Sequence, residues 1–294
     1  MNILLTGANG LLGGKITKKI IEDTDFGVLA VASSPEKVSE MIEREHVDGT
    51  RIHFLSNQDF LKPETELKEV CGAVHLAFAR RTRPAADIAA SIDFAAAVFH
   101  KLADSHIDRV INMSSQGVYG NTEEIRTENT VPAPETQYTM AKYAAEKLFD
   151  DIMKECPHHT SLRLDPVAQS QNVIKGLCKS AKQGQINLKG GKQVFSFIDA
   201  EDVGSAVTAM LQTGGDWAPV YNVGWNRVRY TLTEMAEIIS EAAVYCGYKK
   251  PDIHLEESDI ALWAGMDSTR FAGDTNWKPV IPFPSTARKC MEEL

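Results

Sequence analysis

The sequence predicts an α/β fold, a doubly wound parallel sheet with a smaller, discontinuous C-terminal domain. Two observations predict it. Short apolar runs alternate with longer amphipathic stretches through the first half of the chain, and the first apolar run ends in a glycine-rich turn. Alternation of this kind joins parallel strands by helical crossovers, which are right-handed and cover both faces of the sheet. The length of 294 residues suits one large or two modest α/β domains.

The first half of the chain contains five expected strands with four expected helices between them. The strands are expected at residues 3–5, 28–32, 52–55, 73–77 and 110–113. The helices are expected at residues 11–22, 36–45, 64–70 and 88–105. After a loop rich in Pro, Thr and Glu, a further helix is expected at 138–152 and a sixth strand at 161–164. This order of elements predicts an open parallel sheet with helices on both faces.

The second half is expected to leave the larger domain, return to it and leave again. A loop and helix at 167–184 belong to the smaller domain, whereas strands at 195–198 and 220–223 with a helix between them return to the sheet. An amphipathic helix at 231–245 and the proline-rich end complete the smaller domain. We therefore expect the larger domain to comprise residues 1–164 and about 195–228. The smaller, substrate-binding domain comprises about 165–194 and 229–294.

Composition argues against several classes of partner. The net charge of −9 opposes binding to nucleic acid or anionic membranes. The sequence has no apolar run of about 18 residues that could span a membrane. The five cysteines are scattered without CxxC spacing, and no histidine completes a zinc site, so no metal is expected. Reduced thiols, and a start without a signal pattern, favour a cytoplasmic location.

The segment Thr6–Gly13 reads TGANGLLG and lies between the first expected strand and the first expected helix. Its glycines allow a sharp turn, close approach to a pyrophosphate and close packing of the helix on the sheet. The helix N-terminus adds partial positive charge toward an anion. An ordinary turn with chance glycines is the alternative. The pattern predicts a Rossmann-type dinucleotide site held by Gly7, Asn9, Gly10, Leu11, Leu12 and Gly13.

The choice between NAD and NADP depends on the end of the second expected strand. A carboxylate at that place binds the ribose 2′-hydroxyl of NAD. The segment Val31–Lys37 reads VASSPEK and offers no carboxylate where one is wanted. Ser33 and Ser34 can hydrogen-bond a 2′-phosphate, with Lys37 as a counter-charge, so the sequence leans toward NADP over NAD. The alternative is a polar loop that caps the next helix.

Tyr138 and Lys142 are one helical turn apart and share a helix face. A phenol with a pKa of about 10 is a poor acid or base at neutral pH. A nearby ammonium stabilises phenolate and lowers that pKa toward the working range. The same lysine can hydrogen-bond a nicotinamide ribose. Ser115 lies at the C-terminal end of the fifth strand, where open α/β sheets bind ligands, and is the candidate to hold a substrate oxygen.

Together these segments resemble the extended short-chain dehydrogenase/reductase family, the group of NAD(P)-dependent epimerases and dehydratases. The turn matches its TGxxGxxG motif. The other similar segments are Val74–Ala77, Met113–Gly120, Tyr138–Lys142, Phe197–Val203, Val220–Gly224 and Asn276–Pro279. The resemblance implies that Tyr138 is the catalytic acid/base, that Lys142 lowers its pKa and that Ser115 binds the reacting oxygen. It also implies hydride transfer to or from nicotinamide, a homodimer, and cofactor contacts from Leu76, Ala77 and Phe78.

Two departures from the family pattern affect the expected substrate. Many members bind nucleotide-sugar diphosphates through arginines, where this chain has Phe195-Ser196 and Leu255–Ser258. The two glutamates in the second segment would repel a diphosphate. The remaining candidates for contact with a small-molecule substrate are Arg81, Gln116 and Arg227.

We therefore expect an oxidoreductase of epimerase/dehydratase type that acts at a hydroxyl or carbonyl carbon of a sugar-like substrate. Two alternatives stay open. One is a simple NADPH-dependent reductase of a small carbonyl compound, which the missing arginines favour. The other is a non-catalytic NAD(P)-binding sensor or regulator, which the joint presence of Tyr138 and Lys142 opposes.

Overall fold

The larger part of the molecule is built on one sheet of seven parallel strands, in the order β3-β2-β1-β4-β5-β6-β9. The structure is a computed structural model that describes residues 1–294. The chain starts at the central strand β1, builds outward to β3, and then returns to β4 on the other side. Ligands of open α/β sheets bind where the order reverses in this way. The strands are β1 (Asn2–Thr6), β2 (Gly27–Ala32), β3 (Ile52–Ser56), β4 (Val70–His75), β5 (Arg109–Ser115), β6 (His158–Leu164) and β9 (Val220–Val223).

Helices cover both faces of this sheet, because alternate strand residues are apolar on both sides. Ile3 and Leu5 of β1 join a core beneath α1, α2 and α7, whereas Leu4 joins a second core beneath α4 and α5. The fold class predicted from the sequence is therefore confirmed. These helices are α1 (Leu11–Asp23), α2 (Pro35–Glu45), α4 (Ala85–Asp104), α5 (Gln137–Ile152) and α7 (Ala200–Gln212).

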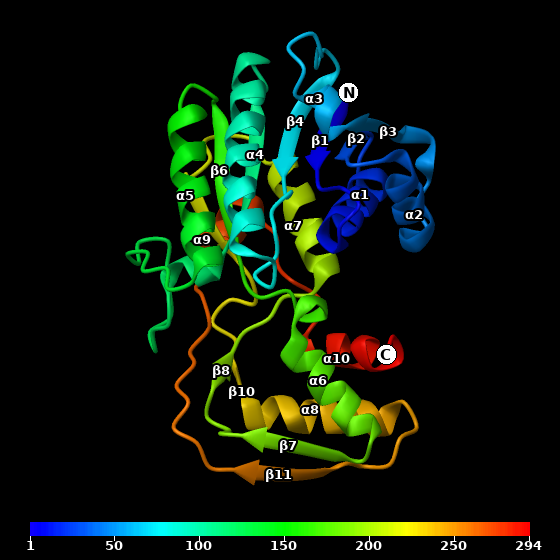
Figure 1. The fold of residues 1–294 in the computed structure, drawn as a ribbon, viewed down its shortest axis with the longest axis vertical. Coiled ribbons are helices and arrows are strands. Elements are labelled where there is room, and N and C mark those ends of the chain that lie inside the picture. The colour runs from blue at the N-terminus through cyan, green and yellow to red at the C-terminus, as the bar shows by residue number, and fades with distance from the viewer.

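A smaller domain with its own apolar core lies beyond the strand ends to which the arrows of the sheet point (Figure 1). The chain enters it after β6 and again after β9. Two short sheets complete it, a parallel pair of β7 and β11 and an antiparallel pair of β8 and β10. Its elements are α6 (Asn172–Lys182), β7 (Gln185–Lys189), β8 (Val194–Phe195), β10 (Tyr230–Thr231), α8 (Leu232–Tyr245), β11 (Asp252–Glu256) and α10 (Phe283–Glu292).

Three local predictions differ from the structure. The strand expected at 195–198 in the large sheet is instead the short β8 (Val194–Phe195), which pairs with β10, because Phe195 and Phe197 pack into the core of the smaller domain. The helix expected at 64–70 does not form, and only the short α3 (Asn57–Phe60) precedes β4. The segment forms turns instead, in which the Thr65 N–H donates to the Lys62 carbonyl oxygen over 3.2 Å and the Val70 N–H to the Leu67 carbonyl oxygen over 3.1 Å, and β4 already begins at Val70. The helix α9 (Thr269–Thr275) lies against β9, and its Phe271 packs with Trp277 in the core of the larger domain. That segment was expected in the smaller domain.

The structure was also searched for a membrane-spanning helix, a metal-binding cluster and disulfide bonds. None of the helices combines the length and the apolar character needed to span a bilayer. No group of three or more His, Cys, Asp or Glu side chains is arranged to hold a metal ion. All five cysteines are free thiols.

Candidate functional site

The glycine turn joins β1 to α1 beside the end of β4. Gly7 adopts a φ of +69°, and a Cβ there would lie 3.1 Å from the backbone of Ala77. A Cβ on Gly13 would lie 2.4 Å from the carbonyl oxygens of Gly7 and Ala8. Both positions therefore require glycine because the backbone leaves no room for a side chain. Gly7 thus permits the tight turn and Gly13 the close packing of α1, which are the roles of the first and third glycines in a dinucleotide-binding motif.

The start of α1 is suited to an anion. Gly10 is the N-cap, and its N–H donates to the Gly7 carbonyl oxygen over 3.0 Å. No side chain caps the helix, and its first turn holds no acidic residue. The N–H groups at Leu11 and Leu12 thus have no carboxylate competing for them, and the helix dipole adds positive charge.

Thr6 fixes the end of β4 next to this turn. Its Oγ1 accepts from the N–H groups of Leu76 and Ala77, at 3.2 and 3.3 Å, and lies in hydrogen-bond contact with Nδ1 of His75 at 2.9 Å. His75 is buried, and burial lowers its pKa to about 3. A buried ring of low pKa, bonded to a strand threonine, is a core histidine. The segment that follows is thereby held against the glycine turn.

The end of β2 carries both signs of charge. Lys37 Nζ donates to Ser33 Oγ over 3.0 Å, so these two exposed side chains lie together. Ser34 is the N-cap of α2, and its hydroxyl hydrogen-bonds the exposed Glu36 carboxylate and lowers its pKa. No carboxylate was expected at this place from the sequence. Glu36 was missed because it belongs to the first turn of α2 and reaches back only to the Ser34 hydroxyl.

Tyr138 and Lys142 lie on one face of α5, whose N-terminus is fixed by a capping box between Thr136 and Thr139. Lys142 is buried, and its Nζ donates to the carbonyl oxygen of Met113 in β5 over 2.8 Å. This bond places the lysine near the carboxyl end of β5.

Phe78 contacts both members of the pair. Its ring centroid lies 4.1 Å from Lys142 Nζ, and the ring meets Tyr138 edge-on with centroids 6.1 Å apart. Phe78 directly follows Ala77, whose backbone lies against Gly7. One short segment therefore connects the glycine turn with the Tyr138–Lys142 pair.

Burial controls the proton affinities of the pair. It raises the pKa of Tyr138 to about 12, and the nearby charge that opposes the rise is Arg81. It lowers the pKa of Lys142 to about 7, against the charge of Glu146. From the sequence, Lys142 was expected to lower the pKa of the Tyr138 phenol toward neutral pH. In this structure the phenol is instead shifted away from neutral pH, because desolvation outweighs the neighbouring charge.

Ser115 ends β5 and begins the 3-10 turn η2 (Gln116–Tyr119). Its Oγ accepts from the Gly117 N–H over 3.1 Å. A Cβ on Gly117 would lie 2.7 Å from Cγ2 of Thr139, the residue after Tyr138. The structure thus brings the expected serine and the start of α5 together. Gly117 allows that approach.

Gln116 is buried, and both ends of its amide are bonded to protein. Its Nε2 donates to Ser196 Oγ over 3.3 Å, and its Oε1 accepts from the Gly265 N–H over 3.2 Å. Ser196 in turn donates to Asp165 Oδ1 over 2.8 Å, and burial raises the pKa of Asp165 to about 7. Gln116 therefore joins η2 to the smaller domain, a role that sequence reasoning missed.

Two arginines named from the sequence have different surroundings. Arg81 is exposed in the loop after β4, and its positive charge acts to lower the pKa of Tyr138, against the effect of burial. Arg227 is exposed, and its Nε donates to Asp267 Oδ2 over 3.0 Å. Its charge is thereby paired within the protein. Phe195, where the sequence led us to look for an arginine, stacks on Phe197 with ring centroids 5.9 Å apart.

A buried ion pair supports the site from below. Arg163 Nη2 lies 2.6 Å from Glu146 Oε2, and Ser114 Oγ also donates to that carboxylate. The Arg163 guanidinium lies 4.6 Å from the ring centroid of Tyr119, whose hydroxyl donates to Asn222 Oδ1 over 2.7 Å. This network joins α5 to β5, β6 and β9. Because both charges are buried and hydrogen-bonded, this ion pair holds α5 in a fixed position against the sheet.

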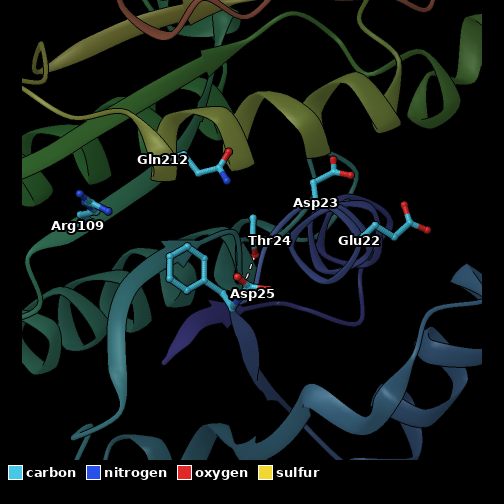
Figure 2. Close-up of a pocket in the computed structure, with 7 residues that line it drawn as sticks. Glu22, Asp23, Thr24, Asp25, Arg109 and Gln212 are labelled. Atoms are coloured by element: carbon cyan, nitrogen blue, oxygen red, sulfur yellow. Dashed lines mark hydrogen bonds between the residues drawn. The ribbon is translucent and has the colours of Figure 1, made fainter.

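The opposite edge of the sheet holds a surface depression (Figure 2). It lies at the amino ends of β2 and β5, away from the glycine turn. Acidic and polar side chains dominate it, and Arg109 there donates to the Leu211 carbonyl oxygen over 3.1 Å. It offers no acid–base pair for hydride chemistry. Its lining residues are Glu22, Asp23, Thr24, Asp25, Phe26, Arg109 and Gln212.

Sequence comparison places the chain in a known family of enzymes. The model of the NAD dependent epimerase/dehydratase family matches residues 3–224. The low-salt glycan biosynthesis protein Agl12 of Haloferax volcanii is 23% identical, over 99% of this chain and 98% of its own length. The dTDP-glucose 4,6-dehydratase of Neisseria gonorrhoeae is 22% identical, over 99% of this chain and 94% of its own length. The family resemblance drawn from the sequence is thus confirmed.

Solved structures share the fold. UDP-glucose 4-epimerase of Thermotoga maritima, with UDP-glucose, superposes with a TM-score of 0.80 at 21% identity, covering 99% of this chain and 98% of that one. UDP-glucuronic acid 4-epimerase of Bacillus cereus, with NAD, superposes with a TM-score of 0.81 at 17% identity, covering 100% and 99%. At such identities the likeness extends to the fold alone.

Proposed function

Because this chain belongs to the NAD-dependent epimerase/dehydratase family and is an NAD(P)-dependent enzyme, we propose that it acts on a sugar-like substrate with Tyr138 as acid/base. Hydride would pass to or from a carbon that bears a hydroxyl or carbonyl group. The observation that carries the proposal is the position of Tyr138 and Lys142 on one face of α5. That face lies at the carboxyl end of β5, one short segment from the glycine turn.

The chain's own residues have separate tasks in this proposal. Bound nicotinamide dinucleotide supplies the hydride acceptor or donor. The glycine turn and the start of α1 bind its diphosphate. Tyr138 takes the proton from the substrate hydroxyl or returns it, and Ser115 hydrogen-bonds the same oxygen. Lys142 holds a ribose hydroxyl through its ammonium.

The substrate we propose is a nucleotide-linked sugar, since the relatives named above act on or bind dTDP-glucose, UDP-glucose and UDP-glucuronic acid. A second candidate is a small carbonyl compound. The stacked Phe195 favours it, because this side chain cannot pair with a diphosphate. A thermal-shift screen compares UDP-, GDP- and dTDP-sugars with small ketones, and turnover with NAD and NADP is then measured for the stabilising compounds. Stabilisation by ketones alone would reject the sugar substrate.

We also propose that Ser33, Ser34 and Lys37 bind a 2′-phosphate and so favour NADP. The 3.0 Å contact between Lys37 and Ser33 supports this, and the carboxylate of Glu36 opposes it by charge. Titrating the protein with NADPH and NADH gives the two dissociation constants. A lower constant for NADH would reject the NADP preference and leave the acid–base proposal intact.

A homodimer through α4 and α5 is a further proposal. These helices pack on each other, and α5 exposes Met140 and Leu148 to solvent, 52% and 37% of each side chain. Light scattering of the purified protein tests it, with Met140→Glu as the disrupting variant.

We also propose a cytoplasmic location, which the free thiols support. The larger domain would bind the dinucleotide and the smaller one the substrate.

A further inference from the structure

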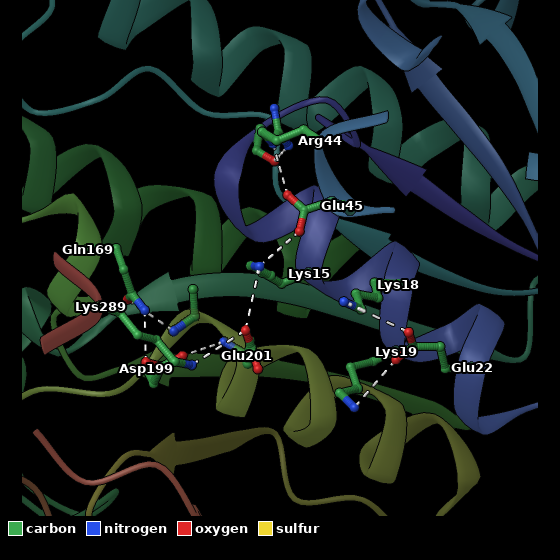
Figure 3. A network of polar contacts seen from close by, with 12 residues as sticks. Lys15, Lys18, Lys19, Glu22, Arg44, Glu45, Gln169, Asp199, Glu201 and Lys289 are labelled. Carbon is green, nitrogen blue, oxygen red and sulfur yellow. Dashed lines mark hydrogen bonds and ion pairs between the residues drawn. The ribbon is translucent and has the colours of Figure 1, made fainter. Parts of the chain in front are cut away.

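Arg44, in the last turn of α2, reaches across to the glycine turn (Figure 3). Its Nη1 donates to the carbonyl oxygen of Asn9 over 3.5 Å, and its Nη2 donates to that of Gly10 over 3.3 Å. Its Nε donates to Glu45 Oε1 over 2.9 Å. One planar guanidinium thus contacts two successive peptide groups of the turn and is held in place by a carboxylate.

Glu45 anchors this contact from below. Its side chain is 3% exposed, and its Oε2 lies 2.9 Å from Lys15 Nζ of α1. Lys15 also approaches Glu201 of α7 over 3.7 Å. A buried carboxylate between two cations keeps its charge and its position. The end of α2 is therefore tied to α1 directly under the turn.

Gly14 provides an independent indication of the same contact. A Cβ at this position would lie 2.7 Å from both Arg44 Nη2 and Glu45 Oε1. The three glycines of the TGxxGxxG motif do not include it. Its lack of a side chain makes room for the Arg44–Glu45 pair against α1.

We propose that Arg44 is a positioning residue for the dinucleotide diphosphate. By holding the carbonyl oxygens of Asn9 and Gly10 on the outer side of the turn, it orients these peptide groups so that the N–H groups of the turn and of α1 face the diphosphate. Its positive charge also lies close to the anion site. This inference rests on the dinucleotide site of the proposed function and adds a residue that acts through the turn.

Arg51 offers a matched control within the same chain. Its Nη1 donates to the carbonyl oxygens of Thr24 and Phe26, each over 2.9 Å. The chemistry is the same as that of Arg44, an arginine bound to backbone oxygens at an end of α1. Its place is the amino edge of the sheet, away from the glycine turn.

The test compares the dissociation constants of NADH and NADPH for the full-length protein and for the variants Arg44→Gln and Arg51→Gln, by fluorescence titration. We expect Arg44→Gln to bind about tenfold more weakly, because charge-assisted hydrogen bonds at the turn are lost. Its kcat at saturating dinucleotide stays unchanged, so the loss appears in KM. We expect Arg51→Gln to lower Tm and to keep the wild-type dissociation constant.

Two further variants sharpen the result. Arg44→Lys keeps the charge but cannot span two carbonyl oxygens, so we expect a smaller loss, and it replaces Arg44→Gln if that variant does not fold. Gly14→Ala displaces the guanidinium, so it should weaken binding in the wild type and add little in the Arg44→Gln background. Unchanged affinity in the Arg44 variants, or an equal loss in Arg51→Gln, overturns the inference. A wild-type protein that binds neither dinucleotide instead rejects the proposed function itself.

Discussion

The glycine turn and the Tyr138–Lys142 pair lie at the same edge of the sheet, but their properties arise in different ways. The turn depends on backbone geometry: the positive φ of Gly7 and the close approach at Gly13 follow from residues within eight positions of each other. The proton affinities of the pair depend on side chains from other elements. Phe78 from the loop after β4 and the Met113 carbonyl of β5 surround Lys142.

This difference separates what a motif determines from what its surroundings determine. The spacing of Tyr138 and Lys142 determines that they share a helix face. The spacing does not determine how far that face is shielded from water. Here burial raises the pKa of Tyr138 and lowers that of Lys142. Variants that act on the turn should change binding, whereas variants that act on the pair should change chemistry and its pH dependence.

The largest expected effect is on the pair. Tyr138→Phe removes the proton donor and keeps the ring against Phe78, so we expect kcat to fall by about 10²–10⁴. The dissociation constant of the dinucleotide should stay within about twofold, because the phenol oxygen is a small part of its site. Steady-state kinetics and a NADH titration on the same preparation measure both. Retained turnover would exclude Tyr138 as the acid/base and indicate another proton donor.

On the turn, Gly13→Ala should affect binding and folding rather than chemistry. The added Cβ would lie 2.4 Å from two carbonyl oxygens that belong to the turn itself, so the start of α1 must move. We expect a loss of about 1–3 kcal/mol in the free energy of unfolding, the usual range for forced overpacking. Denaturant unfolding measures it, and Gly176→Ala, at an open position in α6, is the control. Equal stability of the two variants would contradict the close approach.

The sequence allowed the sheet and the turn to be predicted because both are encoded locally. Fully apolar strands such as 28–32 and the glycine spacing need no distant partner. By contrast, β11 is exposed except for the half-buried Ile253, so its sequence carries no period-two apolar pattern. Its partner β7 does alternate buried and exposed residues, but it is only five residues long and pairs with no sequence neighbour.

The same reasoning explains the parts of the site that were missed. Arg44 lies 34 positions from Gly10, and Gln116 lies 149 positions from Gly265. Neither contact leaves a pattern in the chain. Glu36 was overlooked for a different reason: the expected carboxylate was sought in the strand, and this one returns to it from the next helix. Gly14 was the one local signal, since a fourth glycine has no role in the motif.

A further effect concerns pH and stability. Burial lowers the pKa of Lys142 to about 7, from an ordinary value of 10.5, with Glu146 opposing the shift and His75 held neutral beside it. Between these pH values the unfolded chain binds one more proton than the folded one. The contribution of Lys142 to stability is therefore full above pH 10.5 and is lost as pH falls toward 7.

Lys142→Met removes this titration. The stability of the variant relative to the wild type should rise as pH falls from 10 to 7, by at most about 1.4 kcal/mol per pH unit, and then level off. Urea unfolding at a series of pH values gives the difference. Parallel curves for the two proteins would mean that Lys142 stays charged in the folded state and that water reaches it.

The smallest effect expected lies where the two regions meet. The ring of Phe78 covers the ammonium of Lys142, so a ribose hydroxyl reaches that ammonium only if the ring turns aside. Phe78→Ala should therefore tighten dinucleotide binding, by about three- to tenfold if the ring contact is of ordinary cation–π strength. Because burial raises the pKa of Tyr138, opening the site should also shift the alkaline limb of the kcat–pH profile to lower pH.

Phe78→Leu is the matched control, since it keeps an apolar side chain over the pair but removes the aromatic face. We expect it to retain the position of the alkaline limb and to gain part of the affinity. Weaker binding in both variants would show that Phe78 instead forms a wall of the nicotinamide site. The segment between the turn and the pair would then act by contact with the ligand rather than by covering Lys142.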